Sequence, residues 1–264
     1  MLGKLLKYDY KSNLFYFLLM YGVFFAIAIV ARASLAMVDL DYAAFQDDVL
    51  SVMTAVGSVV LYLIACGALM VLTFLLIAMR FYKNMMGSEG YLSFTLPVTA
   101  GDHLASKLIS GITWLLASYL VVAVSGLIMT AGTDLWSPSF LSFLKKVLDA
   151  LKFYNPLIAV LYVLEGIAGV LQSVLLIYFS ICVGQLAGKH RVLGAFGIFI
   201  ASILVLGIVS TLGNTIFMNL LEDSYGTAVY YGITTAAGLF YRFCVCVGCY
   251  VGSYYIMKGK LNLE

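Results

Sequence analysis

Charged side chains are scarce in this sequence. Only 11% of the 264 residues are Asp, Glu, Lys or Arg, whereas 63% are hydrophobic, and the mean hydropathy is +1.04. A soluble domain has about 25% charged residues, because its surface faces water. The composition therefore excludes an ordinary soluble domain and predicts an integral membrane protein. The net charge of +2 does not indicate nucleic-acid binding, since in a membrane protein the charge of each loop matters more than the total.

Groups that carry out catalysis are equally rare. The only two histidines, His103 and His190, each have a basic residue within four positions and belong to no grouping of nucleophile, base and acid. The sequence also lacks HExxH, GxSxG and the GxxxxGK[ST] phosphate cradle of ATPases. The closest string, GQLAGKH at 184–190, has the wrong spacing and no hydroxyl to hold magnesium. We therefore expect that the chain is not an enzyme and binds no cofactor itself.

The five cysteines all lie in apolar runs, so neither a disulfide framework nor an oxidising compartment is indicated. In the stretch CVCVGC, Cys246 and Cys249 share a helical face, but Cys244 points elsewhere and no histidine lies nearby. Because a protein metal site needs more convergent ligands than this, we expect no metal site.

Six stretches are long and apolar enough to cross a bilayer, whose core of about 30 Å needs about 20 helical residues. The predicted fold class is an all-α integral membrane protein with six transmembrane helices, organised as a single transmembrane domain over residues 1–264. The predicted spans cover approximately residues 14–37, 50–79, 108–131, 156–187, 192–221 and 228–257.

Lysine and arginine indicate how the spans are oriented. If the amino terminus lies inside, the outer loops hold only Lys145, Lys146 and Lys152. The positive-inside rule therefore predicts a multi-pass protein with both termini in the cytoplasm. The basic residues on the cytoplasmic side are then Lys4, Lys7, Lys11, Arg80, Lys83, Lys107, Lys189, Arg191, Lys258 and Lys260.

Two shorter helices are expected beside the spans. Residues 1–12 place leucines on one helical face and lysines on another, a pattern typical of a helix in the lipid headgroup layer. Residues 137–153 begin with a capping serine and a proline and continue with one apolar stripe, which predicts a helix on the outer surface. Each segment has the alternative of being an extension of the adjacent span.

The loop at 80–107, RFYKNMMGSEGYLSFTLPVTAGDHLASK, is the longest segment expected on the cytoplasmic side. Its apolar anchors, among them Phe81, Met85 and Met86, surround a few charges, as in the core of a protein interface. Gly87 and Gly90 allow sharp turns, Pro97 ends the element, and Thr99 can cap the following helix. The loop therefore indicates a docking surface; the alternative is that its aromatic residues only lie in the headgroup region.

The sequence of this loop resembles the permease subunits of ABC-2 type transporters, particularly a group in Gram-positive, often gut-dwelling bacteria. That family frequently has an acidic residue where this chain has Ser88. The residues that carry the resemblance are Phe81, Tyr82, Lys83, Gly87, Glu89, Gly90, Tyr91, Leu92, Phe94, Thr95, Leu96, Pro97 and Lys107.

The resemblance implies a type V exporter-like transmembrane domain, with an N-terminal interfacial elbow helix and a coupling helix between spans two and three. Two permease subunits, identical or paralogous, would form the pathway in a bacterial cytoplasmic membrane. Separate ATPase subunits would bind ATP and magnesium, and the exported substrate would be a hydrophobic or amphipathic drug, peptide or lipid. The residues implied to contact the ATPase are Lys83, Glu89, Gly90, Tyr91, Leu92, Phe94, Leu96 and Pro97.

Three charged residues interrupt the spans: Arg32, Glu165 and Arg242. A charge in the bilayer core is costly unless it is paired or hydrated, so Glu165 is expected to face Arg242, Arg32 or water. The functional hypothesis is a gate or a polar lining of the export route. The alternative is that Arg32 extends to the headgroups and that the other two residues only fix the packing of their helices.

Two other functions remain open from the sequence. The chain could be a membrane interaction or immunity protein that does not pump, or an ion-coupled carrier that uses Glu165. Carriers of the second kind usually contain internal repeats and broken helices, and the sequence contains no such repeat.

Overall fold

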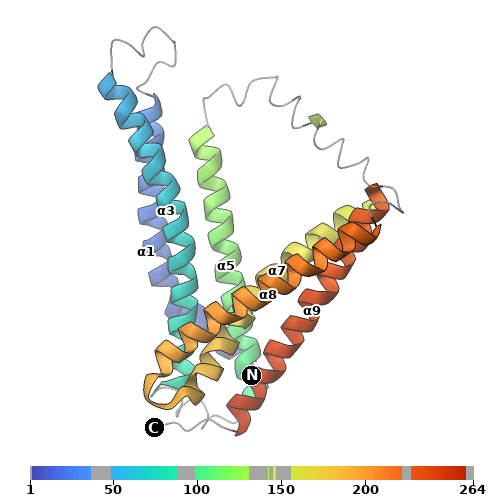
Figure 1. The fold of residues 1–264 in the computed structure, drawn as a ribbon. Coiled ribbons are helices and arrows are strands. Elements are labelled where there is room, and N and C mark those ends of the chain that lie inside the picture. Colours follow the sequence, from blue (N-terminus) through green and yellow to red (C-terminus); the bar gives the residue numbers. More distant parts are fainter. Residues whose placement is uncertain are drawn as a thin grey trace. The chain divides into compact units, whose positions relative to one another are not determined.

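The computed structural model describes residues 2–36, 49–87, 99–130, 142, 145–146, 156–221 and 227–259. Throughout these ranges the chain is almost entirely helical (Figure 1). The helices in chain order are α1 (Leu2–Ala36), α3 (Val49–Phe81) with a π-helical turn (Tyr82–Met86), α5 (Ala100–Thr130), α7 (Pro156–Gly184) with a 3₁₀ turn (Gln185–His190), α8 (Arg191–Leu221) and α9 (Thr227–Gly259).

Six helices within the described residues are long and apolar enough to cross a membrane, which confirms the six predicted spans. Two of the helices begin well before the predicted spans. α5 begins at Ala100 rather than near residue 108, and α1 begins at Leu2 rather than near residue 14. Hydropathy marks only the part of a helix that matches the bilayer, whereas the chain stays helical into more polar sequence.

The two shorter helices expected beside the spans are described to different extents in the structure. Residues 2–12 continue into the first span without a break in α1, which agrees with the alternative of an extension, so the separate elbow helix stays a prediction. Most of segment 137–153 lies outside the described residues, and its described members, Ser142, Lys145 and Lys146, are helical.

The chain divides into two compact units, and α1, α3 and α5 each contribute residues to both. One unit comprises residues 7–76 and 113–144, and the other comprises residues 1–6, 77–112 and 145–264. These units are interleaved in the sequence, so neither is a separate sequence domain.

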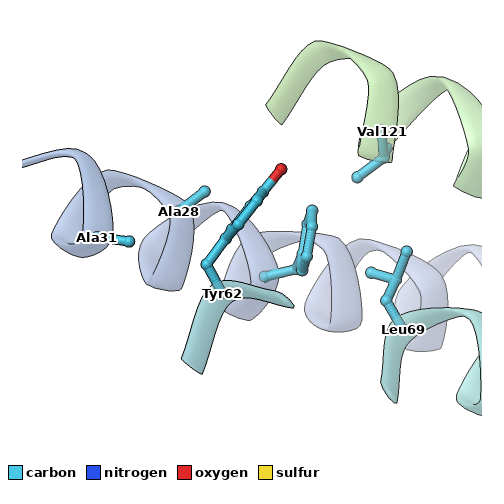
Figure 2. Close-up of a cluster of buried hydrophobic side chains, with 6 residues drawn as sticks. Ala28, Ala31, Tyr62, Leu69 and Val121 are labelled. Carbon is cyan, nitrogen blue, oxygen red and sulfur yellow. The ribbon is translucent and has the colours of Figure 1, made fainter. Parts of the chain in front are cut away.

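In the unit at 7–76 and 113–144, helices α1, α3 and α5 pack around a cluster of apolar side chains (Figure 2). Ala28 and Ala31 on α1 lie in this cluster with Tyr62 on α3. Small residues let helix backbones approach closely in a membrane, where packing rather than the hydrophobic effect holds helices together. Hydrogen bonds add to the packing: the hydroxyls of Tyr62 and Ser125 lie 2.9 Å apart.

A second polar contact in this unit centres on Ser118 of α5. Its hydroxyl lies 2.8 Å from the hydroxyl of Tyr21 on α1 and 2.8 Å from that of Thr73 on α3. Nearby, the rings of Phe17 and Trp114 are stacked, with centroids 4.2 Å apart. One serine therefore joins all three helices of the unit.

In the other unit, α7 packs against α8 and α9. Half of the apolar span of α7 is buried within the chain, whereas none of the α8 span is buried. Leu175 and Leu176 of α7 form a buried cluster with Cys246 and Cys249 of α9, while Cys244 is exposed. The two cysteines thus share a face, as predicted, and fill space between two helices.

Two backbones approach each other closely where α7 meets α8. A Cβ atom placed on Gly184 would lie 2.5 Å from the backbone nitrogen of Ala195, a separation that real side chains do not reach. Gly184 is therefore required for the tight hairpin between the two helices.

We predict that Gly184→Ala destabilises the protein by about 1–3 kcal/mol, because overpacking forces the backbones of α7 and α8 apart. Thermal unfolding of the purified chain in detergent measures this effect. Gly166→Ala is the matched control, since Gly166 lies on the same helix with nothing within 4 Å of its Cβ position. Equal unfolding temperatures for the two variants would contradict the close approach.

Candidate functional site

The sequence predicts two functional regions, the long loop and the charged residues within the membrane. Of the loop residues implied to bind an ATPase, Lys83 lies in the π-helical turn after α3. The others, Glu89, Gly90, Tyr91, Leu92, Phe94, Leu96 and Pro97, lie outside the described residues.

The helix before the loop ends at a glycine. After the π-helical turn, the backbone N–H of Gly87 donates to the carbonyl of Tyr82 at 3.0 Å, and the chain becomes extended. A Cβ atom at Gly87 would lie 2.9 Å from the carbonyl oxygen of Lys83, so a side chain here would collide with the preceding turn. The π-helical turn therefore ends at Gly87, whereas Gly90 and the rest of the predicted turn lie outside the described residues. π-helical turns of this kind are frequent at functional sites.

The helix after the loop begins with the predicted cap. The backbone N–H of Asp102 donates to the hydroxyl oxygen of Thr99 at 3.2 Å, and that hydroxyl donates to the Asp102 carboxylate at 2.7 Å. Such a reciprocal cap satisfies a free N–H group in the first turn of α5. Both borders of the loop are therefore defined by local hydrogen bonds.

The two borders are also fixed to α7. The ring of Phe81, at the end of α3, stacks on Tyr178 of α7 with centroids 4.0 Å apart. The Tyr178 hydroxyl donates to the backbone carbonyl of Lys107 on α5 at 2.8 Å. We call Phe81, Tyr178 and Lys107 the loop base.

The loop base corrects one expectation from the sequence. Phe81, Met85 and Met86 were predicted as anchors for a partner, but 1%, 1% and 6% of their surfaces are exposed. They are buried because the chain stays helical through the π turn and keeps these side chains on a packed face. They pack inside the chain and are not available to a partner.

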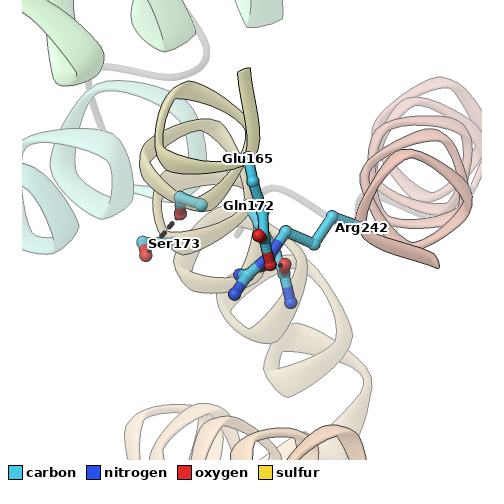
Figure 3. A network of polar contacts seen from close by, with 5 residues as sticks. Glu165, Gln172, Ser173 and Arg242 are labelled. Carbon is cyan, nitrogen blue, oxygen red and sulfur yellow. Dashed lines mark hydrogen bonds and ion pairs between the residues drawn. The ribbon is translucent and has the colours of Figure 1, made fainter. Parts of the chain in front are cut away.

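Within the membrane spans, Glu165 of α7 pairs with Arg242 of α9 (Figure 3). The Nε atom of Arg242 donates to the Glu165 carboxylate at 3.4 Å, and its Nη1 atom donates to the Gln172 side-chain oxygen at 3.2 Å. Of the alternatives left open by the sequence, the structure has Glu165 facing Arg242. Arg32 is half-buried on α1, in the other compact unit.

Two glycines leave room for the charged groups. A Cβ atom at Gly238 on α9 would lie 3.1 Å from the Glu165 carboxylate, and one at Gly169 on α7 would lie 3.4 Å from the Arg242 guanidinium. Each helix thus carries a glycine opposite the charged residue of its neighbour. The packing of α7 against α9 is shaped around the pair.

Gln172 was missed by the sequence analysis. Its side chain is 9% exposed and it lies two helical turns beyond Glu165, so the two side chains share one face of α7. The spacing of seven residues between Glu165 and Gln172 could have indicated a shared polar face. It does not show that both side chains bind Arg242 of α9, which only the structure shows.

The charged pair borders a cavity of about 810 Å³ between α7, α8 and α9. Its wall includes Glu165, Gln172 and Arg242, together with Tyr162 of α7 and Asn214 of α8. The side chains of Arg242 and Glu165 are 37% and 26% exposed, so the pair is reachable from the cavity. A protein cavity of this size and mixed lining is typical of small-molecule sites.

Comparisons with protein-family models, curated proteins and solved structures find no match for this chain. The resemblance to ABC-2 permeases therefore stands on the loop sequence alone.

We predict that Glu165→Leu destabilises the protein by about 2–3 kcal/mol, because the Arg242 guanidinium then lacks a counter-charge within the membrane. The double variant Glu165→Leu with Arg242→Leu removes both charges and should recover most of the lost stability. Unfolding of the wild type, both single variants and the double variant in mixed micelles measures the coupling. A double variant no more stable than the singles would contradict the pairing.

Proposed function

We propose that the chain is the permease subunit of an ATP-driven ABC transporter of the ABC-2 type. The loop sequence at 80–107 and the six membrane-length helices support this proposal. The subunit itself does not hydrolyse ATP; separate ATPase subunits bind ATP and magnesium. A second permease subunit, identical or paralogous, completes the pathway in a bacterial cytoplasmic membrane, with both termini in the cytoplasm.

The observation that carries the proposal is the construction of the loop base. A loop that receives force from a partner must be joined firmly to the elements that it moves, and Phe81 and Lys107 join both borders of this loop to Tyr178. A loose linker would need no such attachment. In the proposed transporter, motion of the ATPase reaches α7 through these contacts.

Helix α7 then links the loop base to the charged pair. Tyr178 and Glu165 lie on the same unbroken helix, separated by about 20 Å at 1.5 Å per residue. A displacement of α7 at the loop base therefore changes the wall of the cavity. In this proposal Glu165 and Arg242 belong to the gate or lining of the export route, and the substrate is hydrophobic or amphipathic.

An ion-coupled carrier is less well supported. Such a carrier needs a carboxylate that exchanges its ion or proton during the cycle, whereas Glu165 is held by Arg242. The third candidate is a membrane interaction protein that does not pump. It differs from the proposed transporter in its binding partner, because only the transporter binds an ATPase subunit.

Purification of the tagged chain from its native membranes in a mild detergent tests the proposal. An ATPase subunit should be recovered in stoichiometric amount and should hydrolyse ATP in the complex. Recovery of the chain without any ATPase would exclude the proposed function.

We predict that Tyr91→Ala and Phe94→Ala each weaken binding of the ATPase by at least about 2 kcal/mol, the loss typical of a central aromatic anchor. ATP hydrolysis should then be uncoupled from transport. The amount of ATPase retained on the purified permease measures the effect. Tyr255→Ala is the control, because Tyr255 is an exposed aromatic residue outside the loop, near the end of the sixth span that is expected to face the cytoplasm. Full retention of the ATPase by both loop variants would count against the docking surface.

We also predict that Glu165→Gln abolishes export while the ATPase stays bound, because the neutral amide cannot hold Arg242 through a charged contact. Survival of cells exposed to a toxic exported amphiphile measures transport, and co-purification measures assembly. If export is unchanged, the pair only fixes the packing of α7 against α9.

A further inference from the structure

Helix α8 carries a polar stripe although it is a membrane span. None of its apolar span is buried, yet Gly207, Ser210, Thr211 and Asn214 all line the cavity beside α7 and α9. These positions repeat at three and four residues, so they share one face of the helix. The polar face of α8 is thus turned to the cavity that Glu165 and Arg242 border.

The polar groups of this wall have spare hydrogen-bonding capacity. The hydroxyls of Ser210 and Thr211 donate to the carbonyl of Gly207 at 3.0 and 2.9 Å, which leaves their oxygen lone pairs as acceptors. Asn214 and Tyr162 also line the cavity, and their polar side chains are exposed to it. Because unsatisfied polar groups are costly in a membrane, the cavity suits an occupant with polar groups of its own.

The wall formed by α7 and α9 carries one negative and one positive side chain, so its net charge is zero. Glu165 and Arg242 neutralise each other, and the guanidinium, which has five N–H donors in total, uses two of its nitrogens for Glu165 and Gln172. The wall therefore offers donors and acceptors together. A ligand with a net charge would bring an uncompensated charge into a region of low dielectric constant, whereas a net-neutral ligand would not.

One end of the cavity is apolar. Leu176, Ile203 and Leu206 line it there, and the Tyr241 hydroxyl donates to the carbonyl of Leu206 at 3.1 Å, joining α9 to α8. Tyr162, Asn214 and Tyr231 lie toward the other end of the same three helices. The cavity is therefore amphipathic along its length.

We infer that the cavity between α7, α8 and α9 binds a net-neutral amphipathic molecule whose polar group carries both hydrogen-bond donors and acceptors. The polar group lies against Asn214 and the charged pair, and the apolar part lies toward Leu176 and Ile203. A zwitterionic headgroup with a primary ammonium and a phosphate has this chemistry. The inference goes beyond the proposed function, because binding requires neither ATP nor a partner subunit.

Photolabelling of the full chain in phosphatidylcholine nanodiscs, without ATP or ATPase, tests this inference. Three probes carry the same diazirine-labelled acyl chain: lysophosphatidylethanolamine, which is net neutral, lysophosphatidylglycerol, which is anionic, and an alkyltrimethylammonium, which is cationic. We expect saturable labelling of the α7, α8 and α9 cavity segments by the neutral probe, about tenfold above that by either charged probe, a difference of about 1.4 kcal/mol. Equal labelling by a charged probe, or labelling spread evenly over α1 and α3, would overturn the inference.

A pair of threonines on α8 provides matched variants. Thr211→Val and Asn214→Leu should each reduce labelling of the cavity severalfold without changing the unfolding temperature, because both side chains are exposed. Thr215→Val should leave labelling unchanged, since Thr215 makes the same kind of hydrogen bond, to the carbonyl of Thr211 at 2.9 Å, but does not line the cavity. Unchanged labelling in both cavity variants would exclude binding at this wall, and it would leave the proposed ATPase partner unaffected.

Discussion

The hydrocarbon core of a bilayer offers no water to polar side chains, so each polar group there must find a partner in the chain or border a cavity. In the unit at 7–76 and 113–144, neutral hydroxyls on facing helices bond to one another. Ser118 and Ser125 lie on one face of α5 and bond to Thr73 and Tyr62 of α3. Such bonds are individually modest in membranes, but they carry no charge and allow the three helices to pack closely.

In the unit that contains α7, α8 and α9, two polar groups satisfy the same constraint by forming an ion pair. Glu165 and Arg242 form an ion pair, and Gln172 accepts a further hydrogen bond from the guanidinium. Gly169 and Gly238 leave space for the two charged groups. The arrangement leaves a cavity beside the charged pair. Replacing such a pair by well-packed apolar side chains is often neutral or stabilising, so stability alone does not explain why the chain keeps it.

The number and type of the elements could be predicted from the sequence because hydropathy is a property of whole segments. The cap at Thr99 could also be predicted, since it depends on a few neighbouring residues. Which side chains meet across helices could not be predicted: the sequence left Glu165 with three alternatives, and it assigned the buried Phe81 and Met85 to a partner. The polar face of α8 was missed because Ser210, Thr211 and Asn214 are too few to lower the hydropathy of a long apolar helix.

Helix α7 is the element that the two candidate regions have in common. Tyr178 holds the loop base, while Glu165 and Gln172 face Arg242, and half of the apolar span of the helix is buried. A packed helix moves as a unit, because core packing allows discrete rearrangements rather than gradual deformation. If the loop responds to a partner, α7 therefore has to carry that response to the cavity, and the contacts of Tyr178 have to hold while the weaker, partly exposed contacts of Arg242 change.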